Sequence, residues 1–204
     1  MNFDIESITW DDERRKGRAK LIAKEISKSI QIKKQYTALE FGCGTGLISF
    51  FLNNKFETIT LVDTSKGMID VLNSKIETLE INNMKAYKMD INENNILPEN
   101  SYDVIYTSMA LHHIIDTKTT IMNLYKLLKK HGYLCIIDLD EEDGSFHKED
   151  KDFNGHNGFN QNDLKSILLE TGFKEAEVNT FYKDEKLVEE SKVDYSLFLM
   201  VGRK

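Results

Sequence analysis

Apolar and polar residues follow one another along the chain in a pattern that predicts strands alternating with helices. Short, nearly continuous apolar runs predict strands over 36–41, 58–63, 84–90, 102–109 and 132–140. Between these runs, the spacing of apolar residues predicts helices over 46–54, 65–81 and 116–130. Such alternation is typical of parallel strands joined by right-handed crossovers, so we expect an α/β fold with helices on both faces of the sheet.

The two ends of the chain depart from this alternation. Residues 12–32 place Ala and Ile at helical spacing, which predicts an amphipathic helix before the first strand. Near the other end, a predicted helix at 160–171 precedes two apolar runs, near 173–182 and 195–204, without a helix between them. These two runs predict an antiparallel hairpin. We therefore expect one domain over 1–204, with a doubly wound, mostly parallel, seven-stranded sheet and a reversed edge strand.

Composition narrows the classes of function. The net charge of -7 gives no overall electrostatic footprint for nucleic acid, and the basic stretch at 14–20 is interpreted as a solvated helix face. Cys43 and Cys135 lie in apolar segments, which favours buried thiols in a reducing compartment over a disulfide. The sequence shows no signal-peptide pattern and no apolar run of the roughly 18–20 residues that a membrane span needs. We expect a cytoplasmic protein.

A glycine-rich turn follows the first predicted strand. The segment EFGCGTG places Gly42, Gly44 and Gly46 at alternate positions. A dinucleotide fingerprint would need its third glycine where Leu47 stands, so a nicotinamide oxidoreductase is disfavoured. The glycines still let the backbone approach a ligand closely.

Three acidic residues stand at the ends of neighbouring predicted strands. Glu40 precedes the glycine turn, Asp63 ends the second strand and Asp90 ends the third. A carboxylate in the position of Asp63 can accept both hydroxyls of a ribose, and Asp90 could accept a hydrogen bond from an adenine amino group. Together the three acids would repel a pyrophosphate and suit a cationic ligand. S-adenosylmethionine, an adenosine with a sulfonium and an α-amino group, meets that description.

Five segments in order carry a family resemblance: LEFGCGTG, LVDTSKGM, KMDI, YDVIYTSMALHHI and LLKKHGYLCIID. The chain resembles class I S-adenosylmethionine-dependent methyltransferases, in particular small-molecule enzymes of the ubiquinone and menaquinone biosynthesis type. The resemblance covers residues 36–140 and implies a Rossmann-like sheet. It departs from the family only in the turn KKHGY, where Gly132 is retained.

The resemblance also implies roles for single residues. The three glycines would border the methionyl part, Glu40 its amino group, and Asp63 the ribose. Met68 would pack on the adenine, while Asp90 and the Ile91 amide would read its edge. Ser108 or Met109 would lie beneath the sulfonium.

The acceptor side is less defined. The segment after the fourth strand lacks the proline motifs typical of nucleobase, glutamine and 5-methylpyrimidine methyltransferases, so we expect a small-molecule acceptor. His112 and His113 are candidate bases for its proton. A predicted active-site loop at 140–160 carries His147 and His156 as candidate acceptor contacts, and Trp10 of the 1–34 cover segment is another.

Several alternatives remain open on sequence grounds. No tight spacing of metal ligands occurs, and no metal is assigned. The chain could instead methylate protein or RNA through a recruiting partner, or bind the cofactor without catalysis. The oligomeric state and the accepting atom are not predicted.

Overall fold

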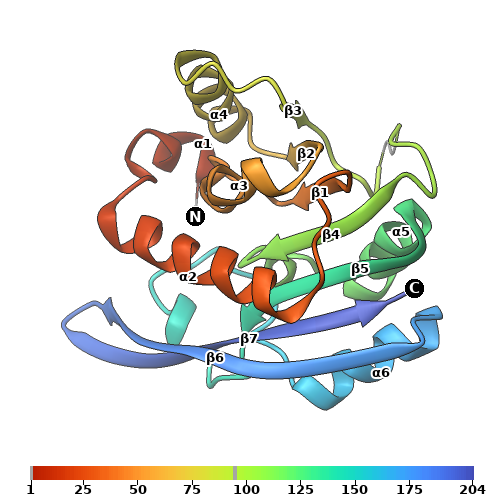
Figure 1. Cartoon of the computed structure of the whole chain (residues 1–204). Helices are drawn as coiled ribbons and strands as arrows, with labels where there is room; N and C mark the ends of the chain where they lie inside the picture. The colour runs from red at the N-terminus through yellow and green to blue at the C-terminus, as the bar shows by residue number, and fades with distance from the viewer. Residues whose placement is uncertain (1, 94–95) are drawn as a thin grey trace.

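All seven strands of the computed structural model, which describes residues 2–93 and 96–204, form one mixed sheet (Figure 1). Residue 1 of the predicted 1–34 cover segment lies outside the described residues. The strands are β1 Thr37–Phe41, β2 Thr58–Asp63, β3 Met84–Lys88, β4 Tyr102–Ser108, β5 Leu128–Leu139, β6 Glu175–Val188 and β7 Ser191–Arg203.

The order of strands across the sheet is β3-β2-β1-β4-β5-β7-β6. The predicted fold class is confirmed, since β1 to β5 are parallel neighbours and β7 runs antiparallel to both β5 and β6. The reversed strand β7 is inserted between β5 and β6, so the outermost strand of the terminal hairpin is β6. Strand order reverses between β1 and β4, and ligands bind at such a switch point in open α/β sheets.

Helices cover both faces of the sheet. The longer helices are α2 Glu13–Ser29, α4 Lys66–Thr78, α5 Thr117–Leu127 and α6 Gln161–Thr171. The shorter segments are α1 Phe3–Glu6, η1 Ser7–Thr9, α3 Leu47–Leu52, η2 Asn53–Lys55, η3 Leu111–His113 and η4 Ser145–His147.

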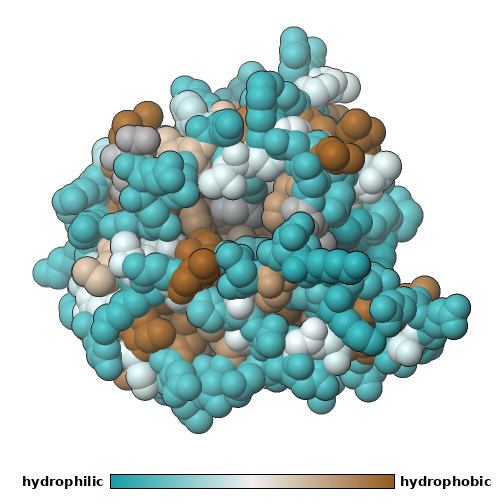
Figure 2. Space-filling view, turned by 180° about the vertical axis from the view of Figure 1, so that it is seen from behind, coloured by the Kyte–Doolittle hydropathy of each residue, from teal (hydrophilic) through white to brown (hydrophobic). Residues whose placement is uncertain are grey.

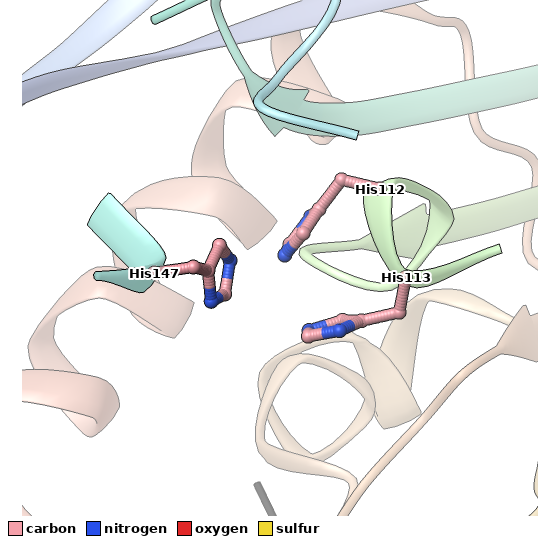
Figure 3. A group of neighbouring side chains, drawn as sticks. All are labelled: His112, His113 and His147. Carbon is pink, nitrogen blue, oxygen red and sulfur yellow. The ribbon is translucent and has the colours of Figure 1, made fainter. Parts of the chain in front are cut away.

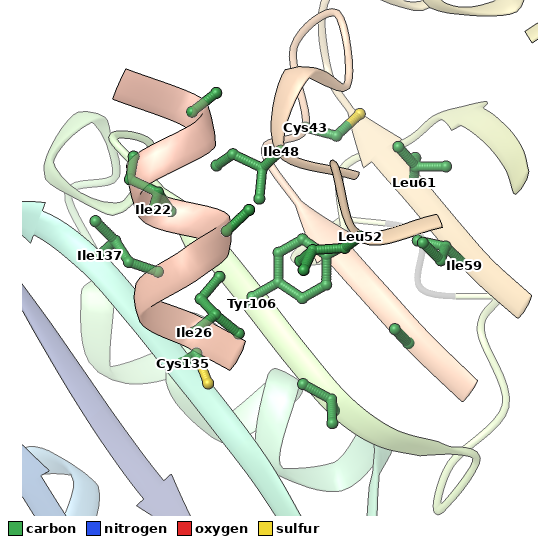
Figure 4. Close-up of a cluster of buried hydrophobic side chains, with 14 of the residues drawn as sticks. Ile22, Ile26, Cys43, Ile48, Leu52, Ile59, Leu61, Tyr106, Cys135 and Ile137 are labelled. Atoms are coloured by element: carbon green, nitrogen blue, oxygen red, sulfur yellow. The ribbon is translucent and has the colours of Figure 1, made fainter. Parts of the chain in front are cut away.

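Two hydrophobic clusters, one on each face, hold these layers together. The first packs α2, α3 and α4 against the sheet, and Figure 4 shows Ile22 and Ile26 of α2 beside Tyr106 and Ile137 of the strands. The second packs α5 and α6 against the opposite face through residues such as Leu124 and Leu168. Alternate strand residues face the two clusters, as expected for a sheet buried on both sides.

The structure extends three strands beyond their predicted bounds. Strand β5 begins at Leu128, four residues before the predicted start. The charged segment between the last two strands is not a loop, because β6 continues to Val188 and β7 begins at Ser191. Glu189, with φ of 54°, lies in the short connection. These charged strand ends are largely exposed, so ladder hydrogen bonds rather than burial define them.

The side of the molecule seen in Figure 2 is predominantly hydrophilic, with hydrophobic side chains in small separate groups. Within residues 2–93 and 96–204, no helix combines the length and hydrophobicity that crossing a bilayer requires.

Candidate active site

A cavity of about 470 Å³ lies at the switch point of the sheet. The glycine turn after β1 and the segments following β2, β3 and β4 form its floor, and the N-terminal region with α2 forms its cover. The fold therefore brings together segments from Phe3 to Ile115 at the place where a doubly wound sheet binds its ligand.

Two of the three glycines in the turn lie too close to their neighbours for a side chain. A Cβ on Gly42, whose φ is 65°, would lie 2.4 Å from the Cβ of Ala110. Gly44, with φ of 50°, faces the cavity next to Trp10 and Met68. Gly46 is buried behind the turn, where a Cβ would meet Leu72. Gly42 and Gly44 thus line the cavity, and Gly46 leaves room for the side chain of Leu72 of α4.

Glu40 is a buried acid at the cavity wall, with only 2% of its surface exposed. Its Oε2 accepts a hydrogen bond from Ser49 Oγ, which lies 2.6 Å from Tyr106 Oη. Burial raises the pKa of Glu40 to about 8, and the negative charge of Asp63 adds to this shift. Glu40 has no ion-pair partner among the described residues.

Two further acids complete the acidic lining. Asp63 accepts hydrogen bonds from the backbone amides of Gly44, at 2.8 Å, and Ser65, at 2.9 Å. Burial raises the pKa of Asp63 above its usual value. Asp90, which also lines the cavity, accepts from the amide of Asn92 at 2.8 Å. All three predicted acids therefore surround one cavity.

Of the other predicted cofactor contacts, Met68 and Ser108 line the cavity. The side chain of Ile91 is buried in the second hydrophobic cluster and is not part of the lining. Met109 lines the cavity with a φ of 55°, a left-handed backbone conformation that is uncommon for a side chain of this kind.

The N-terminal region is fastened over the cavity by two acids. Asp4 accepts hydrogen bonds from Ser65 Oγ, at 2.6 Å, and from the amide of Gly67, at 2.9 Å. Asp11 pairs with Lys75 at 2.5 Å. Between these two points, Trp10 lines the cavity wall.

The predicted histidines separate into two groups. His113 lines the cavity, and His112 lies directly behind it with 1% of its surface exposed. His147 is also buried, and its ring centre lies 5.1 Å from that of His112 and 5.3 Å from that of His113. Burial lowers the pKa of His113 to about 4 and that of His147 to about 3, so both rings are neutral at physiological pH.

His156 lies apart from this group and outside the cavity lining. Its Nε2 is 3.2 Å from Thr117 Oγ1 and 3.0 Å from the carbonyl oxygen of Ile114, and its amide donates to the carbonyl of His112. These bonds hold the 140–160 loop against η3, so His156, a predicted acceptor contact, lies outside the lining of this cavity.

A family comparison agrees with this geometry. The methyltransferase domain family matches residues 32–187, which is more than half of the chain. The chain belongs to the class I S-adenosylmethionine-dependent methyltransferases. The cofactor of this family is S-adenosylmethionine, as predicted from the acids and the glycine turn.

Curated methyltransferases share about a third of their aligned residues with this chain. It is 33% identical over 159 residues to an uncharacterised methyltransferase of Schizosaccharomyces pombe, covering 72% of this chain and 56% of that protein. It is 33% identical over 143 residues to malonyl-[acyl-carrier protein] O-methyltransferase 1 of Ilyobacter polytropus, covering 67% and 50%. The chain thus spans about half the length of these relatives.

Solved methyltransferase structures share the fold at low sequence identity. YcgJ of Bacillus subtilis superimposes with a TM-score of 0.73 at 14% identity, covering 89% of this chain and 97% of that one. Phosphoethanolamine N-methyltransferase 2 of Haemonchus contortus, in complex with S-adenosyl-L-methionine, gives 0.74 at 16% identity, covering 89% and 52%.

The cavity of this methyltransferase fits its cofactor chemically. A buried carboxylate without a cationic partner among the described residues, Glu40, is suited to an α-ammonium group. Gly44 leaves the backbone open to the ligand, and Asp63 has two carboxylate oxygens for hydroxyl donors. The ammonium group and the ribose hydroxyls of the cofactor thus each have a complementary group at the cavity.

Several residues at this site were not predicted. Ser49 and Tyr106 form the hydrogen-bonded support of Glu40, and Asp138, which is fully buried, pairs with His112. An acid inside the apolar run CIIDLD was a usable signal for Asp138, because charged residues are rarely buried without a partner. Nothing in the sequence relates Ser49 to Tyr106, since 57 residues separate them.

Proposed function

We propose that this methyltransferase domain transfers the methyl group of S-adenosylmethionine to a nucleophile of a small molecule bound in the same cavity. The observation that carries the proposal is the arrangement of Glu40, Asp63 and Asp90 around an open glycine turn at the switch point. This arrangement favours a cationic adenosine ligand over a pyrophosphate.

We assign the cofactor contacts from the positions of these side chains. The turn at Gly42 and Gly44 borders the methionyl part, with Glu40 directed to its ammonium group. Asp63 accepts the ribose hydroxyls. Met68 packs on the adenine, and Asp90 with the Ile91 amide binds its edge. Ser108 lies near the sulfonium, which supplies an activated methyl group and a good leaving group.

The protein then has to orient the acceptor and exclude water. Phe3, Trp10 and Ile115 add apolar surface to the cavity near His113. Such surface excludes water from a displacement reaction, in which positioning accounts for much of the rate acceleration. His113 is neutral at physiological pH and can accept a proton from an acceptor hydroxyl, amine or thiol.

The cover over the cavity supports a small acceptor rather than a macromolecule. Asp4 and Asp11 fasten the N-terminal region to α4 and its N-cap, so this region covers part of the cavity and limits the size of the acceptor. Arg15 and Arg18 of α2 line this wall, and their guanidinium groups suit an acceptor with an anionic group. A relative named as a malonyl-[acyl-carrier protein] O-methyltransferase agrees with an acid-bearing acceptor group, although its name places that group on a carrier protein.

The cofactor assignment is tested by the affinity of an Asp63→Asn variant for S-adenosylmethionine. We expect the dissociation constant, measured by titration calorimetry, to rise by tenfold or more, because an amide cannot accept from both ribose hydroxyls while bonded to Gly44 and Ser65. Asp103→Asn is the matched control. Asp103 also accepts a hydrogen bond from a backbone amide, but it lies at the start of β4, whereas the cavity is at the end of this strand.

Two results would contradict the proposal. If the two variants bound S-adenosylmethionine equally well, Asp63 would not be the ribose contact. The absence of any rise in melting temperature with S-adenosylmethionine or S-adenosylhomocysteine would reject the cofactor site itself. Transfer of a labelled methyl group to a compound in a metabolite extract tests catalysis separately from binding.

A further inference from the structure

Three buried or half-buried imidazoles form a compact cluster beside the cofactor cavity. One ring nitrogen from each of His112, His113 and His147 lies within 4.8 Å of the others. Figure 3 shows His112 and His113 extending from the turn after β4 and His147 reaching them from a separate segment, with the three rings directed into a common space. The sequence could not predict this cluster, because His147 lies 34 residues after His113 in the chain.

The nitrogen atoms of this cluster are poorly satisfied within the protein. His112 Nε2 and both ring nitrogens of His147 are buried without a hydrogen-bond partner among the described residues. Buried polar atoms are nearly always hydrogen bonded or ligated, so three orphaned nitrogens in one place indicate a missing ligand. Stacking of His147 on Phe153, at 3.9 Å between ring centres, orients the ring but satisfies neither nitrogen.

An acid behind His112 orients its free nitrogen toward the cluster. His112 Nδ1 is 2.5 Å from Asp138 Oδ1, and the amide of His112 donates to Asp138 Oδ2. A carboxylate partner keeps the proton on Nδ1 and leaves the lone pair of Nε2 available. This carboxylate–histidine arrangement is the usual support of a histidine that binds a metal.

We propose that His112, His113 and His147 bind one divalent transition-metal ion of the zinc class. Three imidazoles with an open fourth position match the ligand set of catalytic zinc sites. Tetrahedral coordination requires nitrogen atoms roughly 3.3 Å apart. Side-chain rotations that move each ligand nitrogen by about an ångström would bring the present spacing of up to 4.8 Å to this value.

The position of the site gives the ion access to the cavity. His113 belongs both to the cluster and to the cavity lining, so the fourth ligand position adjoins the acceptor. An acceptor hydroxyl or thiol bound there loses its proton to solvent more readily, because the cation stabilises the anion. With the ion bound, His113 acts as a metal ligand in place of the base described under the proposed function. This last step rests on the proposed function, whereas metal binding by the histidines does not.

The test measures metal binding by the purified chain without cofactor. Titration of the metal-free protein with Co²⁺, followed by its visible absorption, and competition with Zn²⁺ should give one site per chain with micromolar or tighter affinity. His147→Phe retains a ring that can stack on Phe153 and should weaken Co²⁺ binding at least 100-fold. His113→Gln, at a less buried position, should weaken it as well.

The chain offers a matched control and a positioning variant. His131 is an exposed histidine of β5 with φ of 67°, and His131→Asn should leave Co²⁺ affinity unchanged. Asp138→Asn should weaken binding by about tenfold or more through His112. The conservative variant Asp138→Glu should recover part of the affinity.

Specific outcomes overturn the proposal. Absence of stoichiometric Co²⁺ or Zn²⁺ binding does so, as does unchanged affinity in both His147→Phe and His113→Gln. Affinity for S-adenosylmethionine is measured on the same proteins and should persist in His147→Phe. Loss of metal binding with retained cofactor binding shows that the two sites are separate. Absence of metal binding would then contradict only the metal site, and absence of cofactor binding only the proposed function.

Discussion

Glu40 combines a buried position with a function that requires negative charge. Burial raises the pKa of Glu40 to about 8, so in most molecules the side chain is protonated at neutral pH before a cation binds. An ammonium group beside it favours the ionised carboxylate. Binding of S-adenosylmethionine should therefore release a proton from Glu40 to solvent.

This coupling predicts a pH-dependent affinity. Between pH 6 and pH 7, affinity for S-adenosylmethionine should rise by up to about tenfold, because the ionised fraction of Glu40 rises by about that factor. Calorimetry in buffers of different ionisation enthalpy should count up to one proton released. Glu40→Gln should bind more weakly and without this pH dependence. Constant affinity of the unmodified protein across this range would contradict the role of Glu40.

The raised pKa of Glu40 also makes the free energy of unfolding depend on pH. Affinity for the cofactor rises with pH, whereas this contribution to stability falls. Because the folded-state pKa of Glu40 exceeds the ordinary value of 4.5, the native state binds more protons between pH 4.5 and about 8. The contribution of Glu40 to the free energy of unfolding is thus fully present below pH 4.5 and is lost as pH rises to about 8.

At the scale of elements, α2 serves as a cover whose attachment depends on one apolar stripe. Ile22 and Ile26 are buried in the first hydrophobic cluster, whereas Leu21 on the same helix is 48% exposed. The helix holds Arg15 and Arg18 at the cavity, so its packing also positions part of the site.

We expect Ile26→Ala to lower the free energy of unfolding by about 2–5 kcal/mol, since it removes a fully buried side chain and leaves a cavity. Leu21→Ala, the matched control, should change it by no more than about 0.5 kcal/mol. Urea denaturation followed by circular dichroism gives both values. Similar losses in the two variants would show that α2 is not anchored through this stripe.

Elements were predictable from sequence where hydrophobic burial defines them. The central strands and their helices follow the apolar pattern, and three acids at strand ends indicated the cavity. The long hairpin strands escaped prediction because exposed charged residues form much of them. His147 could not be placed beside His112, because the path of the 140–160 loop depends on tertiary contacts.

For the whole molecule, the cavity draws on the glycine turn, the cover and the segment after β4, whereas the terminal hairpin lies at the far side of the sheet. Binding of a ligand should therefore stabilise these regions unequally. Ligand binding should stabilise residues 3–18 and 42–47 the most.

Hydrogen exchange with and without S-adenosylhomocysteine tests this expectation. Slower exchange should appear in 3–18, 42–47 and 108–115, because these segments surround the ligand, and exchange within 175–203 should change little. Protection confined to the hairpin, or spread evenly over the chain, would contradict a cofactor site at the switch point. Asp63→Asn at the same ligand concentration should show reduced protection.

The insertion of β7 between β5 and β6 has a consequence for the order of folding. Strand β6 pairs only with β7 among the described strands, although β6 precedes it in the chain. During synthesis β6 therefore leaves the ribosome without a partner and with an unpaired backbone. The sheet can close only when residues 191–203 have emerged, so truncation within β7 would leave β6 undocked and the edge of β5 open to association with other chains.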